Sequence, residues 1–281
     1  MLENLQYLAD KSVYFALIVS VLVALCAGLL GVMLVLKRYS MIGDGLSHVA
    51  FGAYAVAVVL SFADNMILTI PVTIIVAILL LKVKENAKIK GDTLIAMLST
   101  GAMAIGYLVL NVTGGINVTG DVCTTLFGGV TILCLTTQDV IVSSVLAVIV
   151  IVVFLIFYNR LFSVTFDETF AKATGLKAGI YKIILAVVTA IVVVLAMELV
   201  GALLISALIV FPALSAMRVT KSFRGVVIVS AIISVVSAVV GLLSACLSDA
   251  PIGSTIVVVN IVIFLVCYLI QFVKKGVNRA K

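Results

Sequence analysis

One carboxylate and one imidazole stand four residues apart in an otherwise apolar stretch of the chain. They are Asp44 and His48, in the segment GDGLSH (43–48), and His48 is the only histidine among the 281 residues. Side chains at this spacing lie on the same face of a helix, one turn apart. An oxygen and a nitrogen ligand so placed suit a divalent ion such as Zn²⁺ or Mn²⁺. The spacing also suits a proton relay or a structural carboxylate–histidine pair, so these three interpretations stay open.

The composition places this pair in a membrane. Of the residues, 64% are apolar and 11% are charged, and the mean hydropathy is +1.41. Such a composition excludes a soluble globular or a disordered protein, because a chain this apolar needs lipid as its solvent. An ionisable side chain within a span costs about 2.5–3.5 kcal/mol even on insertion scales. Asp44 and His48 are therefore expected to serve a function.

Apolar runs between charges and turn residues predict an all-α, polytopic transmembrane helix bundle that forms a single domain over 1–281. We expect about nine spans, with eight to ten allowed by the length: 13–36, 41–62, 66–81, 93–111, 139–158, 180–197, 199–217, 225–247 and 254–273. The piece 122–137 is too short and too rich in Gly and Thr for a span, so we interpret it as a re-entrant segment on the outer side. Two spans would meet at 197–199, where a single broken helix is the competing interpretation.

The basic residues predict the orientation. With the N-terminus outside, all but one of the 18 Lys and Arg residues fall on the cytoplasmic side, the exception being Lys11. The positive-inside rule therefore predicts an N-out and C-in chain. The net charge of +6 is explained by this topology, and no nucleic-acid partner is expected.

Two acidic residues on the outer side are candidates for an entry path. Glu198 lies at the outer end of a span and Asp121 lies in an external loop, although solvated surface positions would look the same. The chain has no GxxxxGK[ST] loop, so it is not expected to bind ATP in that way.

The largest internal connection, about 159–179, is expected to carry a short amphipathic helix on the cytoplasmic face. Ser or Thr before the Asp-Glu pair at 167–168 is typical of a helix start, and Gly175 is typical of a stop. Phe166 and Phe170 have the i, i+4 spacing of one helix face. The helix could rest on lipid headgroups or dock into a groove of a cytoplasmic partner.

Several motifs follow one another in a recognisable order. The segment KRYSMIGDGLSH (37–48) has a basic pair followed by Gly-Asp-x-x-Ser-His, and FDETFAKATG (166–175) has Phe-Asp-x-x-x-Ala-x-x-x-Gly. The segment VGALLISALIVFPA (200–213) has Val-Gly-x-Leu-Leu…Pro-Ala, and DAPIG (249–253) has a weaker Asp-x-Pro-x-Gly pattern. Over essentially the whole chain, this order resembles the permease subunits of ATP-binding-cassette importers for zinc, manganese and iron, the ABC-3 family.

The resemblance implies a fold like that of type II ABC importer permeases, in the bacterial inner membrane. It implies that Asp44 and His48 are metal ligands on the translocation path. It also implies a coupling segment that contacts the ATPase, formed by Phe166, Asp167, Glu168, Phe170, Ala171 and Gly175. The implied partners are a second copy of the permease, cytoplasmic ATP-binding subunits, an external metal solute-binding protein and membrane lipid. ATP hydrolysis would occur on the separate subunit, and the divalent metal would be cargo, with no tightly bound cofactor.

The residues after His48 bear on the choice of metal. Many relatives, especially those for manganese, continue with Leu-Pro-Gly, whereas this chain continues VAFG (49–52), closer to the zinc members. We therefore expect zinc, with manganese or iron as alternatives. The runner-up is a proton-coupled secondary metal transporter that works without an ATPase, with Asp44 and His48 as its proton-exchanging pair. An intramembrane enzyme would need a further catalytic partner, and the sequence offers no clear one.

Overall fold

The protein is described from a computed structural model. The structure describes residues 11–61, 65–82, 91–113, 134–248 and 250–279. Within them the regular secondary structure is helical, without strands. The helices are α2 (Lys11–Leu36), α3 (Ile42–Val59), α4 (Met66–Lys82), α5 (Gly91–Val112), α7 (Thr137–Phe166), α8 (Glu168–Ala173), α9 (Ala178–Val200), α10 (Ala202–Val219), α11 (Phe223–Ser248) and α12 (Ile252–Arg279).

The expected polytopic bundle is confirmed. In the described part of the chain, 8 helices are long and apolar enough to cross a membrane. The apolar helix α4 has 17 residues, slightly below the length of about 20 that a span needs. With α4 included, the described part of the chain has an apolar helix for each expected span, although several of the ends differ. Most of the proposed re-entrant segment 122–137 lies outside the described residues, as does Asp121.

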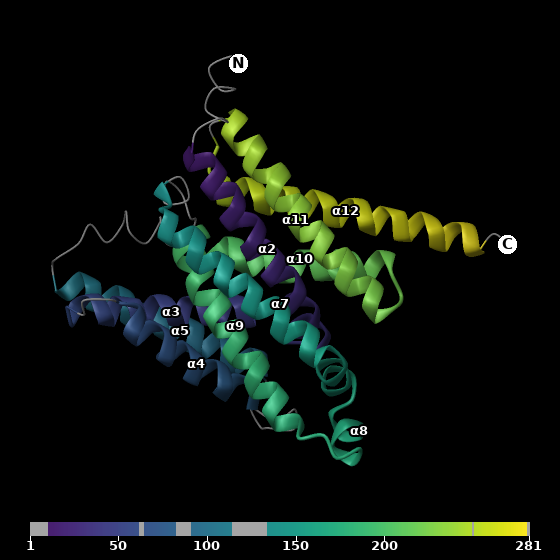
Figure 1. The fold of residues 1–281 in the computed structure, drawn as a ribbon, viewed down its shortest axis with the longest axis horizontal. Coiled ribbons are helices and arrows are strands. Elements are labelled where there is room, and N and C mark those ends of the chain that lie inside the picture. The colour runs from purple at the N-terminus through teal and green to yellow at the C-terminus, as the bar shows by residue number, and fades with distance from the viewer. Residues whose placement is uncertain (1–10, 62–64, 83–90, 114–133, 249, 280–281) are drawn as a thin grey trace.

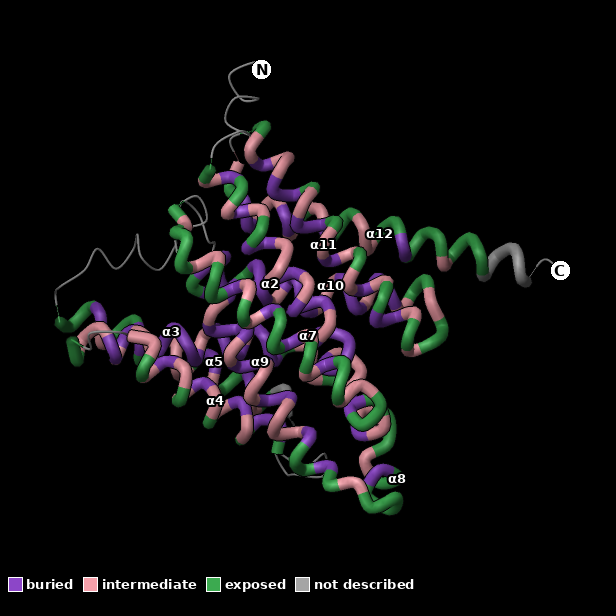
Figure 2. The backbone as a smooth tube through the Cα atoms, viewed as in Figure 1, coloured by how far each residue is buried: buried purple, intermediate pink, exposed green. Residues whose placement is uncertain are grey.

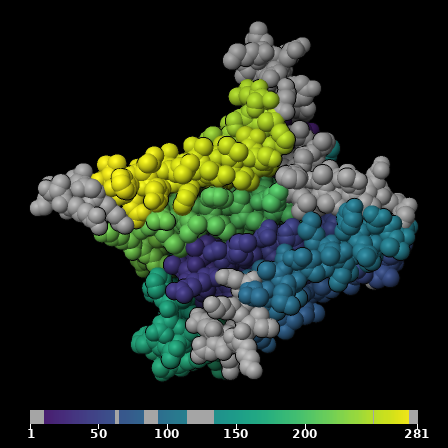
Figure 3. Space-filling view, turned by 180° about the vertical axis from the view of Figure 1, so that it is seen from behind, coloured from purple at the N-terminus to yellow at the C-terminus, as the bar shows by residue number. Residues whose placement is uncertain are grey.

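Helix α2 lies at the centre of the bundle, against α7, α10 and α11 (Figure 1). Figure 2 shows that much of its length is buried. Helices α3, α4 and α5 pack together on one side, and α9 joins them to the centre. On the other side α12 packs against α10 and α11, and the view from behind shows α12 in yellow along one edge and the α3–α5 group in blue along the other (Figure 3).

Small residues let the central helices approach one another closely. The hydroxyl of Ser230 on α11 donates a hydrogen bond of 2.9 Å to the Gly28 carbonyl on α2. A Cβ atom placed on Gly31 would lie 2.1 Å from the Ile209 carbonyl oxygen on α10. Close backbone approach and interhelical hydroxyl bonds are what hold helices together in lipid, where the hydrophobic effect does not drive helices together.

Helices α9 and α10 are separated by a single residue, Gly201. Its backbone has φ +97° and ψ 151°, a conformation open to glycine and strongly strained for other residues. After this joint the chain changes neighbours, because α9 packs on α4 whereas α10 packs on α2, α11 and α12. The sequence predicts this joint at 197–199, whereas the structure places it at Gly201. Glu198 therefore belongs to the last turn of α9.

Candidate functional site

Helix α3 presents Asp44 and His48 one turn apart, as their spacing predicts. The helix begins at Ile42, so Asp44 lies in its first turn, where the free N–H groups and the helix dipole favour a carboxylate. The Ser47 hydroxyl donates a hydrogen bond of 2.8 Å to the Asp44 backbone carbonyl. Ser47 is thereby satisfied within its own helix, and the two ionisable side chains are left to form the site.

The distance between the Asp44 and His48 side chains indicates whether they bond directly to each other. His48 Nε2 and Asp44 Oδ1 are 3.6 Å apart, and the side chains are 17% and 34% exposed. This separation exceeds the roughly 2.7–3.2 Å of a good hydrogen bond. Two ligands each about 2.1 Å from one tetrahedral ion lie roughly 3.4 Å apart. The two side chains are thus close enough to bind one ion together, and they are not joined by a direct hydrogen bond.

The second ring nitrogen of His48 has a different environment. Nδ1 is buried and has no hydrogen-bond partner among the described residues. Histidine ligands usually donate from the nitrogen that does not bind the metal, which fixes the ring. No such donor contact of His48 is present among the described residues.

Two glycines next to Asp44 bring neighbouring helices against α3. A Cβ atom on Gly43 would lie 2.8 Å from Ile209 Cδ1 of α10, and one on Gly45 would lie 2.5 Å from Ile95 Cγ2 of α5. At Gly43 an added Cβ would meet only the flexible tip of the Ile209 side chain, whereas at Gly45 it would meet the Ile95 side chain more closely. We did not assign Gly43 and Gly45 to the site from the sequence. Their positions on either side of Asp44, an ionisable residue within a span, were the signal that could have identified them.

The pair is not a complete ligand set by itself. Among the described residues, no group of three or more His, Cys, Asp and Glu side chains is placed to hold a metal ion. Glu198 is exposed in the last turn of α9, where an entry-path role stays a prediction. A closed tetrahedral site needs four ligands, so Asp44 and His48 supply half of one.

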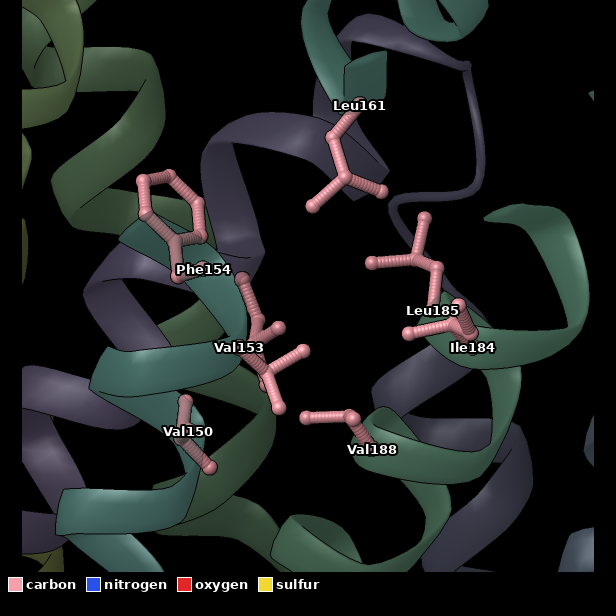
Figure 4. Close-up of a pocket in the computed structure, with 8 residues that line it drawn as sticks. Val150, Val153, Phe154, Leu161, Ile184, Leu185 and Val188 are labelled. Carbon is pink, nitrogen blue, oxygen red and sulfur yellow. The ribbon is translucent and has the colours of Figure 1, made fainter. Parts of the chain in front are cut away.

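An apolar pocket lies between α2, α7 and α9, away from this pair (Figure 4). Its lining side chains are all hydrocarbon: Leu30, Val150, Val153, Phe154, Leu161, Ile184, Leu185 and Val188. Such a lining offers no ligand atom to a cation. We therefore keep the candidate metal site at Asp44 and His48.

The internal connection is shorter than the expected 159–179, because α7 continues to Phe166. The Phe166 ring lies 4.7 Å from the Phe162 ring and 5.9 Å from the Phe223 ring of α11, between centroids. These contacts keep Phe166 on α7, and the extended backbone of Asp167 (φ −146°, ψ 98°) separates it from the next helix. The prediction that Phe166 and Phe170 share one helix face is wrong.

The short helix α8 has the predicted stop at Gly175, but Asp167, and not a preceding Ser or Thr, caps its start. The Asp167 side chain accepts a hydrogen bond of 2.9 Å from the Phe170 backbone N–H, which caps the first turn. At the other end, the Leu176 N–H donates to the Ala171 carbonyl at 3.0 Å, and Gly175 has φ +82°. This is a Schellman cap. Ala171 is buried, whereas Phe170 is 63% exposed.

Glu168 joins α8 to α9. Its carboxylate pairs with Lys172 Nζ at 2.7 Å on its own helix and with Lys182 Nζ on α9. Partial burial raises the pKa of Glu168, but hydrogen bonds and attraction from the two lysines outweigh this effect and lower the pKa below its ordinary value. We did not single out Lys182 from the sequence, because no local pattern links it to Glu168.

Comparison with known proteins identifies the family. The model of the ABC 3 transport family matches residues 9–271. The manganese import system permease protein ScaB of Streptococcus gordonii is 29% identical, over 94% of this chain and 93% of that protein. The high-affinity zinc uptake system membrane protein ZnuB of Haemophilus influenzae is 27% identical, over 89% of this chain and 94% of that protein.

A solved structure agrees with this assignment. PsaBC from Streptococcus pneumoniae, in complex with Fab, superimposes with a TM-score of 0.82 at 28% identity, covering 95% of this chain and 94% of that one. The chain is thus a multi-span protein of the bacterial cell membrane. From its sequence, its helices and these relatives, it belongs to the ABC 3 transport family.

Proposed function

We propose that this chain is the permease subunit of an ATP-binding-cassette importer that carries a divalent transition metal ion, zinc, into the cytoplasm. The 3.6 Å separation of His48 Nε2 and Asp44 Oδ1 is the observation that carries this proposal. Relatives named for manganese import and for zinc uptake support the class of cargo. ATP hydrolysis takes place on a separate cytoplasmic subunit.

The ligand types favour zinc over manganese. An imidazole nitrogen beside a carboxylate oxygen is a usual ligand combination for zinc, whereas manganese sites are richer in oxygen ligands. The absence of proline from residues 49–52 points the same way.

Asp44 and His48 replace part of the hydration shell of the ion as it crosses. The remaining ligands come from water or from the same pair in the second copy of a homodimeric permease. An external solute-binding protein delivers the ion to the outer side, where Glu198 faces the entry path. Because each pair supplies only part of a closed shell, the ion can also leave.

Helix α8 is the site at which the ATPase docks. Its caps give it a fixed shape, and the exposed Phe170 is an apolar anchor of the kind that fills a partner's groove. Phe166 has a different role from the one expected, because it packs within the aromatic cluster of α7 and α11. Asp167, Glu168, Ala171 and Gly175 shape the docking helix.

Reconstitution tests the transport mechanism. The permease, co-purified with its ATPase and placed in proteoliposomes, is expected to take up radioactive zinc only when ATP is supplied on the ATPase side. Permease alone under an imposed proton gradient is the control. Uptake by the permease alone would establish the secondary transporter instead, and a strong preference for manganese in the ATP-driven assay would reassign the cargo.

Cysteine labelling tests the N-out, C-in orientation, which the basic residues support. In a cysteine-free background, Thr113→Cys at the end of α5 is expected to react with an impermeant maleimide on intact cells. Lys172→Cys on α8 is expected to react only after the membrane is permeabilised. Both native side chains are exposed, so access to reagent depends on the side of the membrane. The reverse pattern would overturn the orientation.

A further inference from the structure

One ion pair links the docking helix to α9, a long helix that packs against α3, the helix that bears Asp44 and His48. Glu168 of α8 pairs with Lys182 in the second turn of α9. The Lys182 side chain is 19% exposed, whereas Lys172, the other partner of Glu168, is 60% exposed. Lys182 thus makes the more enclosed of the two contacts, and it is the one that joins two helices.

The inner end of α9 is braced in further ways. Arg160 of α7 donates a hydrogen bond of 2.9 Å to the Tyr181 hydroxyl, and the Phe157 ring lies 5.8 Å from the Tyr181 ring between centroids. Tyr181 is the residue next to Lys182. The first turns of α9 therefore contact α8 through Lys182 and α7 through Tyr181.

The outer half of α9 packs against the helix that bears the metal ligands. Val194 and Met197 of α9 are buried in one cluster with Ala50 and Phe51 of α3, two and three residues after His48. Residues 182 and 197 are roughly 22 Å apart along a helix that rises about 1.5 Å per residue. Figure 1 shows α9 running from beside α8 to the group of α3, α4 and α5.

The rest of α9 has the properties of a rigid connector. Between these two ends its inward side chains belong to the main core: Leu185, Ala186, Ala190, Val192 and Val193. Close-packed helices shift between discrete arrangements as units and do not deform continuously. A displacement of α9 at Lys182 is therefore expected to displace Val194 and Met197 as well, because the helix moves as a unit.

We propose that the Glu168–Lys182 ion pair makes α9 the lever by which movement of α8 changes the packing of α3 at Asp44 and His48. Glu168 and Lys182 are positioning residues, because they touch neither the ion nor ATP. This inference rests on the proposed function, in which an ATPase acts through α8. Glu168 keeps Lys172 as a partner when Lys182 is replaced, so removing this pair is expected to alter energy coupling and leave the fold intact.

The test compares two lysines that share one carboxylate. In proteoliposomes with the ATPase, Lys182→Gln is expected to lower the number of zinc ions transported per ATP hydrolysed by about fivefold or more, within the usual range of coupling between sites. Lys172→Gln removes only the contact within α8 and is expected to keep the wild-type ratio. The double exchange Glu168→Lys with Lys182→Glu is expected to restore much of the ratio, and so is Lys182→Arg.

Two results would overturn the role of α9 as the lever. The first is an equal number of zinc ions transported per ATP for Lys182→Gln and Lys172→Gln. The second is a double exchange that folds, as judged by thermal melting, yet does not restore this number. Phe170→Ala serves as the separate test of docking, since it is expected to reduce ATPase co-purification while Lys182→Gln retains the ATPase. If the wild-type complex shows no ATP-driven uptake, the proposed function falls, and the lever falls with it.

Discussion

Replacing Asp44 by asparagine, or His48 by alanine, is expected to reduce metal uptake to background while the permease still assembles with its ATPase. Each change removes one of the two proposed ligand atoms, which lie 3.6 Å apart. Even outer partners of metal ligands are worth about 10–100-fold in metal affinity, so the loss of a direct ligand costs at least that much. ATP-driven zinc uptake in proteoliposomes measures the effect, and co-purification of the ATPase reports assembly.

Ser47→Ala is the matched control for these variants. It lies between the two ligands in sequence and loses only a hydrogen bond to the Asp44 carbonyl of its own helix. Hydroxyl bonds of this kind are not needed by a helix, so uptake close to wild type is expected. Normal uptake by both Asp44→Asn and His48→Ala would remove the pair from the translocation path.

Gly31→Ala is expected to destabilise the permease severely. The added Cβ would lie 2.1 Å from the Ile209 carbonyl oxygen and 2.9 Å from its carbonyl carbon, both backbone atoms of α10. Overpacking a tight interior costs about 1–3 kcal/mol and sometimes more, and here no flexible side chain can move aside. Thermal unfolding in detergent, followed by monodispersity on gel filtration, measures the loss.

Gly101→Ala provides the comparison for Gly31→Ala. A Cβ at Gly101 on α5 would have no neighbour within 4 Å, so nothing opposes it. Alanine is favoured over glycine in a helix interior by about 0.5–1 kcal/mol, so this variant is expected to melt at or above the wild-type temperature. Equal melting of the two variants would mean that α2 and α10 do not approach as closely as their backbones indicate.

The helices could be predicted because lipid demands them. A span must satisfy its own backbone hydrogen bonds within a continuous apolar helix, and such runs are visible in the sequence. The ends of the helices are harder to predict. Asn159 and Arg160 predict the end of a span, yet α7 continues to Phe166. Arg160 bonds to Tyr181, and the last turn packs among aromatic rings. Gly201 was likewise missed as a joint, because helical glycines are common in membrane proteins.

The candidate site likewise has a part that the sequence predicts and a part that it does not. The pairing of Asp44 with His48 is a local property of helical spacing, so the sequence alone was sufficient to propose it. The contacts of Gly43 with Ile209, and of Glu168 with Lys182, join segments that are separated along the chain. No spacing rule connects such residues, because the folded arrangement of the helices brings them together.

The lack of a hydrogen-bond partner for His48 Nδ1 among the described residues has a consequence for kinetics. A partner at this nitrogen would add about 10–100-fold to metal affinity. Differences in affinity between related sites are expressed mainly in the dissociation rate. With His48 as a metal ligand, we expect an ion residence time shorter by a similar factor than at a site that has such a partner. The dissociation rate of zinc from the purified complex measures it.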